Sequence, residues 1–115
     1  MNTDLRDKDY IEHILHAIGK IHNYVDVSGK DGFFQDEMVQ DAVIRNLEVI
    51  GEAVSKLSES TKAENEQLPW RQISGMRNRL IHGYMTTNLE IVWNTVEKVL
   101  PEFNKQIMEL KITTR

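Results

Sequence analysis

The sequence predicts an all-α protein, a four- to five-helix up-down bundle formed by a single domain over residues 1–115. Apolar residues recur at spacings of three and four in several successive stretches, which is the period of an amphipathic helix. No stretch shows the alternating pattern of a half-buried strand. The segments between the periodic stretches are too short to separate domains, and 115 residues normally share one core.

The first predicted helix runs from about Asp7 to Val27, and "VSGKDG" then breaks it with two glycines, a serine and an aspartate. Asp36 is a suitable N-cap for a second helix over roughly 37–58. Two helices of about twenty residues joined by a short loop pack antiparallel. Their apolar faces are carried by Ile11, Ile14, Ile18, Ile21 and Val25, and by Val39, Val43, Leu47, Ile50, Val54 and Leu57.

The polar segment "SESTKAENEQLP" predicts a loop with one weak helical turn near 62–66. A third, shorter helix starts at Pro69 or Trp70 and ends near His82, where Gly83 is a natural stop. Asn88 is a good N-cap for a fourth helix, which Pro101 should kink or restart. Apolar residues continue beyond the proline at Phe103, Ile107, Met108 and Leu110.

The composition is that of a globular protein, with 40% hydrophobic and 28% charged residues. No apolar run approaches the roughly 18 residues of a transmembrane helix, and the N-terminal residues lack the pattern of a signal peptide, so we expect a cytoplasmic location. The chain has no cysteine, which excludes disulfides and thiolate metal sites.

The net charge of -4 argues against a protein that coats nucleic acid non-specifically. The local charge differs, because no acidic residue lies between Glu66 and Glu90 whereas Arg71, Arg77 and Arg79 fall within that window. An anionic partner is therefore expected to bind there.

The segment "RNRLIHGY" concentrates polar side chains beside an apolar run, at Arg77, Asn78, Arg79, His82 and Tyr84. Asn78 and His82 are four residues apart and neighbours on a helix, whereas Arg77 and His82 differ by about 140° in a regular helix. A helix break, the long arginine stem or a second copy of the segment could bring them together. We expect a composite site at a two-fold interface.

These residue types suit phosphodiester chemistry. An imidazole can take up or release a proton near neutral pH, and a guanidinium is a permanently charged fork for phosphate oxygens. RNA supplies its own nucleophile, the 2'-hydroxyl, so no metal is required. Asn78 could orient the imidazole or bind phosphate, and Tyr84 could stack on a base. The structural alternative is that His82 caps the helix, the arginines are solvated and Tyr84 lies at the core edge.

The segment also resembles a known family. "RNRLIHGY" matches the R-x4-H-x-Y signature of HEPN domains of the HepT-like toxin type, with Arg77, His82 and Tyr84 at the signature positions. The stretches "DKDYIEHILHAIGKIHNYV", "DAVIRNLEVIGEAVSKLS", "LPWRQISGMRNRLIHGY" and "IVWNTVEKVLPEF" are similar to that family's successive helices, so nearly the whole chain is covered.

The resemblance implies a dimerising HEPN bundle that acts as a metal-independent endoribonuclease, the toxin of a toxin-antitoxin pair, without a cofactor. It implies that Arg77 and His82 are catalytic and that Asn78 is a polar helper. Its partners would be RNA, a second copy of the chain and a nucleotidyltransferase-fold antitoxin that silences the toxin by transferring AMP onto Tyr84. Arg79 is outside the signature and is expected only to add supporting positive charge.

Other interpretations remain open. The chain could be a non-catalytic HEPN module that binds a nucleotide or docks on a nucleotidyltransferase, or a helical scaffold. His13 and His16 have a spacing that could ligate a metal, but a clear third ligand is missing and solvated or interface histidines are preferred. For Glu52, an ion-paired structural role is favoured over a contact that supports Arg77.

Overall fold

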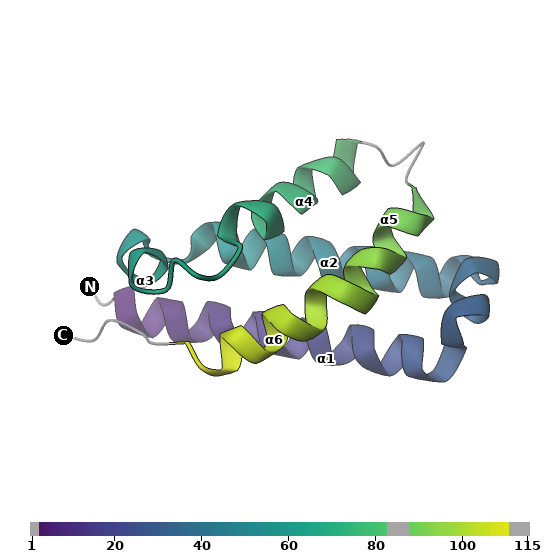
Figure 1. Cartoon of the computed structure of the whole chain (residues 1–115), viewed down its shortest axis with the longest axis horizontal. Helices are drawn as coiled ribbons and strands as arrows, with labels where there is room; N and C mark the ends of the chain where they lie inside the picture. The colour runs from purple at the N-terminus through teal and green to yellow at the C-terminus, as the bar shows by residue number, and fades with distance from the viewer. Residues whose placement is uncertain (1–2, 83–87, 111–115) are drawn as a thin grey trace.

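Two long helices form the body of the molecule. The computed structural model describes the backbone of residues 3–82 and 88–110, and the side chains of residues 6–76 and 88–110. α1 (Thr3–Gln35) and α2 (Glu37–Lys56) run antiparallel, as predicted (Figure 1). Asp36 is the N-cap of α2, where its carboxylate accepts a hydrogen bond from the Met38 amide at 2.9 Å. An acceptor at this position satisfies an amide that has no partner within the helix.

α1 is longer than the sequence predicts, because "VSGKDG" forms a kink and not a loop. Gly29 adopts φ 69° and ψ 174°, a conformation that is essentially restricted to glycine. The chain resumes a helical path after this residue and brings Phe33 into the core, where it is fully buried. The Phe33 ring lies 5.1 Å from the Phe34 ring and 5.3 Å from the Trp93 ring. The segment expected to be a simple break therefore supplies core side chains.

α3 (Glu59–Glu64) replaces the weak turn predicted near 62–66 and begins three residues earlier. Ser58 is its N-cap, because the hydroxyl accepts a hydrogen bond from the Thr61 amide at 3.2 Å. α4 (Trp70–His82) has the bounds that the apolar spacing predicts. Gly83, its expected stop, lies outside the described residues.

The last part of the bundle consists of α5 (Leu89–Asn94), a π-helix η2 (Thr95–Val99) and α6 (Leu100–Met108). Asn88 caps α5 as predicted, and its side chain accepts from the amides of Glu90 and Ile91. Pro101 has no amide hydrogen and its ring collides with the carbonyl four residues before it. The widened η2 turn precedes this proline, and a new helix starts at it, which is the restart expected from the sequence.

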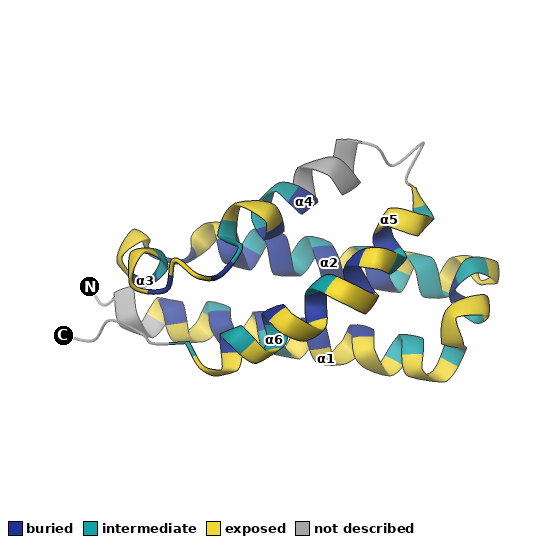
Figure 2. Cartoon of the chain, in the orientation of Figure 1, coloured by how far each residue is buried: buried dark blue, intermediate teal, exposed yellow. Residues whose placement is uncertain are grey.

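The core lies between α1, α2, α4 and the α5–α6 segment, where the buried residues face inward (Figure 2). Of the apolar residues singled out by spacing, Met108 is wrongly assigned, because it is 69% exposed. Met38 is 78% exposed, whereas Met76 is buried. The largest fully buried side chains are those of Phe33, Phe103, Ile14, Ile21, Leu47, Ile50 and Ile73.

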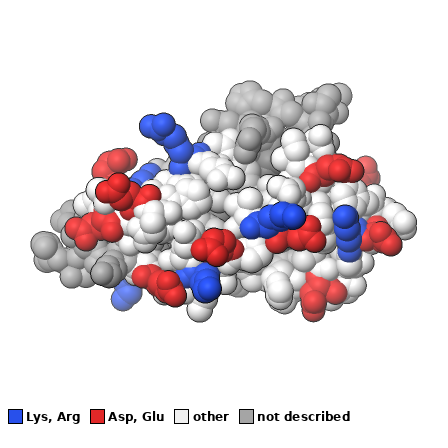
Figure 3. All heavy atoms as spheres, in the orientation of Figure 1, with Lys and Arg blue, Asp and Glu red and all other residues white. Residues whose placement is uncertain are grey.

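These elements confirm the all-α bundle, and no strand occurs in residues 3–82 and 88–110. Within those same ranges, no helix combines the length and the apolar character needed to cross a membrane. On the face drawn in Figure 3, the described acidic and basic side chains are interspersed. Dimerisation remains a prediction.

Candidate functional site

Four of the five candidate residues lie in the second half of α4. Arg77, Asn78, Arg79 and His82 belong to this helix, although their side chains lie outside the described ones, and Tyr84 lies outside the described residues altogether. The helical backbone makes Arg77 and His82 about 7.5 Å apart along the axis and about 140° apart around it. The regular helix assumed in the sequence argument is thus present up to His82.

The first half of α4 holds this segment in place. Ile73 is fully buried and Met76 is 5% exposed, and α4 packs against α2. The Trp70 indole donates a hydrogen bond to the Asn65 carbonyl at 3.0 Å and packs edge-to-face on Phe103 at 6.3 Å. These contacts of the partly buried Trp70 anchor the start of α4 against the bundle.

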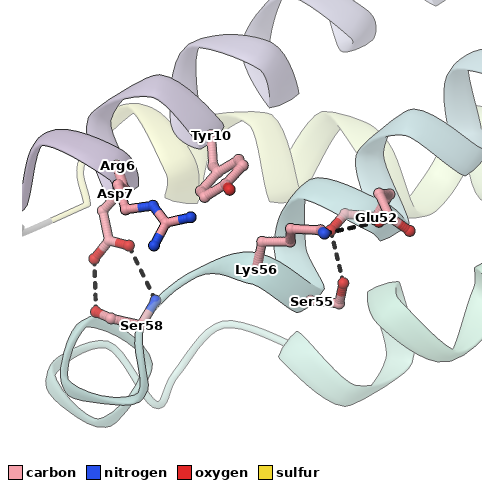
Figure 4. Close-up of a pocket in the computed structure, with 7 residues that line it drawn as sticks. All are labelled: Arg6, Asp7, Tyr10, Glu52, Ser55, Lys56 and Ser58. Carbon is pink, nitrogen blue, oxygen red and sulfur yellow. Dashed lines mark hydrogen bonds and ion pairs between the residues drawn. The ribbon is translucent and has the colours of Figure 1, made fainter. Parts of the chain in front are cut away.

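A polar hollow of about 490 Å³ lies between α1 and α2, near the start of α3 (Figure 4). The Arg6 guanidinium and the Tyr10 ring extend from α1 into this space, and Lys56 lies on the opposite wall. The other lining residues are Asp7, Glu52, Ser55 and Ser58.

A second hollow of about 370 Å³ adjoins the first, because the two share Tyr10, Glu52 and Lys56. Together they form one channel, which we call the charged groove, with Arg6, Tyr10 and His13 on its α1 wall and Arg45, Glu48, Glu52 and Lys56 on its α2 wall. The groove was not predicted from the sequence. Its available signal was the spacing of Arg6, Tyr10 and His13, which puts them on successive turns of one helix.

The two glutamates of the groove form ion pairs with basic residues of the same helix, α2. Arg45 lies 3.9 Å from Glu48, and the Lys56 ammonium lies 3.4 Å from the Glu52 carboxylate. The pair between Lys56 and Glu52 agrees with the structural role favoured for Glu52. A contact between Glu52 and Arg77 would involve a side chain outside the described ones, so that alternative stays a prediction.

Asp7 lines the groove, and its carboxylate points toward Ser58 (Figure 4). Only 1% of Asp7 is exposed. Its carboxylate accepts hydrogen bonds from the Ser58 amide at 3.0 Å, the Ser58 hydroxyl at 2.6 Å and the Thr61 hydroxyl. The negative charge of Asp7 is thereby directed at the start of α3, where amide groups favour an anion.

Two other features are weaker candidates for a functional site. His13 and His16 are exposed on α1, and among the described residues no three His, Asp or Glu side chains gather closely enough to hold a metal ion. A hollow of about 560 Å³ between α1 and the η2–α6 segment is lined chiefly by apolar side chains. Its titratable groups are His22 and Glu97, so it offers no permanent positive charge.

Comparison with known proteins identifies the family. The sequence profile of the family described as ribonuclease HepT-like matches residues 14–110. A Thermococcus cleftensis protein named "Probable ribonuclease HepT" is 35% identical over 90% of this chain and 94% of its own length. A Caldanaerobacter subterraneus subsp. tengcongensis protein named "Putative RNase" is 37% identical, covering 90% of this chain and 92% of its own.

A further relative, from Methanocaldococcus jannaschii and also named "Putative RNase", is 38% identical over 88% of this chain and 84% of its own length. No solved structure matches the chain. The profile match begins within the first half of α1, ends just beyond α6 and includes the whole of α4. The chain belongs to the ribonuclease HepT-like family.

Proposed function

We propose that the protein is a metal-independent endoribonuclease and the toxin of a toxin-antitoxin system. The observation that carries the proposal is the presence of Arg77 and His82 five residues apart on α4, in a chain whose residues 14–110 match the ribonuclease HepT-like profile. The relatives named as ribonucleases support the same activity.

The reaction uses the RNA's own 2'-hydroxyl. A base removes the proton of this hydroxyl, the oxygen attacks the adjacent phosphorus, and the 5'-oxygen of the next nucleotide leaves with a proton. His82 serves in proton transfer, and the Arg77 guanidinium stabilises the negative charge that builds on the phosphoryl oxygens. Asn78 orients the imidazole or the phosphate, and Arg79 adds positive charge.

The proposal also includes regulation of the activity by a partner protein. A nucleotidyltransferase-fold antitoxin would transfer AMP onto the Tyr84 hydroxyl, which places a bulky anion close in sequence to His82. Such an adduct would occupy the phosphate site and repel RNA. The active form is a homodimer, and the expected location is the cytoplasm.

Cleavage of RNA by the purified full chain, with EDTA present, tests the activity. We expect Arg77→Ala and His82→Ala each to lower the rate by about 100- to 10,000-fold, the range typical for loss of a proton-transfer or charge-stabilising group. Lys105→Ala is the control that also removes one positive charge, because Lys105 is exposed on α6 and lies outside the basic window around Arg77. It should change the rate by less than about threefold.

Two results would contradict the proposal. Cleavage that disappears with EDTA would exclude the metal-independent mechanism. Tight nucleotide binding without any cleavage would indicate a non-catalytic HEPN module.

A further inference from the structure

We infer that the charged groove between α1 and α2 binds the RNA strand that flanks the scissile phosphate. The inference rests on the proposed ribonuclease function and adds a substrate-binding surface remote in sequence from α4. The groove would hold single-stranded RNA, with cations on its two walls contacting phosphates and Tyr10 stacking on a base.

The dimensions of the groove suit a short stretch of single strand. Its two hollows measure about 490 and 370 Å³, and each lies within the range of about 300–1,000 Å³ that bound small molecules occupy. Arg6 and His13 are seven residues apart on α1, which corresponds to about 10 Å along the helix. The groove therefore has room for more than one nucleotide.

The groove is lined by three permanent cations, Arg6, Arg45 and Lys56, and by three carboxylates, so its affinity for phosphate depends on which cations are free to contact it. Among the described residues Arg6 makes no ion pair, and its guanidinium extends into the groove (Figure 4). Lys56 is paired with Glu52, but the two side chains are 50% and 45% exposed, and pairs at such positions are weak. Lys56 can therefore turn toward a phosphate at little cost. The charge of Asp7 is already satisfied by Ser58 and Thr61.

The aromatic residue distinguishes RNA from other anions. Tyr10 is half-buried and lies between the cations of the two walls. Its ring packs edge-to-face with the His13 ring at 6.4 Å, which leaves a stable platform. Aromatic rings interleaved with cations are the usual means of binding single strands, because every base can stack.

The groove and the helix that carries the candidate catalytic residues share a neighbouring helix. α2 packs on α1 at one side and on α4 at another, so it is the shared neighbour of the groove and of the helix that carries Arg77 and His82 (Figure 1). A strand bound in the groove needs to pass only over α2 to reach α4.

Fluorescence anisotropy with a labelled single-stranded 12-nucleotide RNA tests the inference, using the full chain with His82→Ala to prevent cleavage. In this background we expect the double variant Arg6→Gln, Lys56→Gln to raise Kd by about tenfold. We also expect the slope of log K against log salt to become less steep by about 1.4, which is about 0.7 for each of two lost phosphate contacts. Lys20→Gln with Lys98→Gln is the charge-matched control, because both lysines are exposed and neither lines the groove. It should leave Kd within about twofold.

Tyr10 provides an independent test. Tyr10→Leu should weaken RNA binding about tenfold, whereas Tyr10→Phe retains the ring and should bind as the parent does. Thermal unfolding followed by circular dichroism ensures that the compared variants are folded at the assay temperature.

Equal Kd values for the groove and control variants would overturn the inference, even if the wild-type protein cleaves RNA through Arg77 and His82. Groove variants that lose binding to a nucleotidyltransferase partner while keeping RNA affinity would overturn it in favour of protein docking. A wild-type protein that binds the 12-mer through the groove but never cleaves it would support the groove and refute the proposed ribonuclease.

Discussion

At the scale of single residues, a buried carboxylate joins two segments distant in sequence. Asp7, in the first turns of α1, accepts hydrogen bonds from Ser58 and Thr61 at the start of α3. Thr61 is fully buried, so its hydroxyl depends on the Asp7 carboxylate for an acceptor. The contact fixes the end of the bundle at which the charged groove lies.

Removing the Asp7 carboxylate should therefore destabilise the protein. We expect Asp7→Ala to lower the free energy of unfolding by about 2–4 kcal/mol, because it removes the acceptor of the buried Thr61 hydroxyl and of the half-buried Ser58 amide and hydroxyl. Urea denaturation measures the change. Asp9→Ala, at an exposed position two residues away, is the control and should alter stability by no more than about 0.5 kcal/mol. Equal effects of the two substitutions would show that the network is not needed for stability.

Two glycines of α1 should respond in opposite directions to the same substitution. Gly29→Ala should destabilise the fold by about 1–3 kcal/mol, since φ 69° with ψ 174° is unfavourable for any residue with a Cβ atom. Gly19 lies in regular helix, and a Cβ there would meet no atom within 4 Å. Gly19→Ala should stabilise the protein by up to about 1 kcal/mol. Thermal melts of both variants check the signs, and a stabilised Gly29→Ala would exclude the kinked backbone.

At the scale of elements, the bundle depends on how each helix starts. Asp36, Ser58 and Asn88 cap α2, α3 and α5 with side-chain oxygens, so each helix begins at a defined residue. Proline acts differently, because Pro101 forces a new start at α6 after the π-helical turn. These local contacts define where each helix begins.

The cap of α5 is directly testable. Asn88→Ala should cost about 1 kcal/mol of stability, since it removes the acceptor for the amides of Glu90 and Ile91. Asn94→Ala is the matched control, because Asn94 is exposed and makes no side-chain cap bond to the helix that follows it. Chemical denaturation compares the two, and a similar loss in both would argue against a capping role.

At the scale of the whole molecule, the arrangement of Arg77 and His82 predicts how two copies cooperate. The backbone positions of the two residues are about 140° apart around a regular helix, so we expect a site that combines groups of two protomers. A heterodimer with Arg77→Ala in one protomer and His82→Ala in the other would then retain one intact site. Purified through two different tags, it should cleave RNA at about half the wild-type rate.

The parent homodimers provide the comparison, because both should be almost inactive. Activity of the heterodimer as low as theirs would show that arginine and histidine of the same protomer act together, or that both copies of each are required. A monomeric wild-type protein in sedimentation experiments would contradict the shared site directly.

Apolar spacing and capping residues by themselves determine most of the helices, since both act within a few residues along the chain. They place α2, α4 and the restart at Pro101, and they put Arg77 and His82 on one helix. The predicted helix bounds are wrong where contacts with residues distant in sequence determine the structure. Phe33 is recruited to the core by Trp93 beyond the kink at Gly29, and α3 starts early because Asp7 binds Ser58.

The charged groove belongs entirely to the tertiary structure. Arg6 and Lys56 are fifty residues apart in sequence, and only the antiparallel packing of α1 on α2 brings them to opposite walls of one hollow. Local sequence encodes which side of a helix is apolar, but not which neighbour covers that side. A surface built from two helices therefore becomes visible only when the packing energy of the whole core has chosen their pairing.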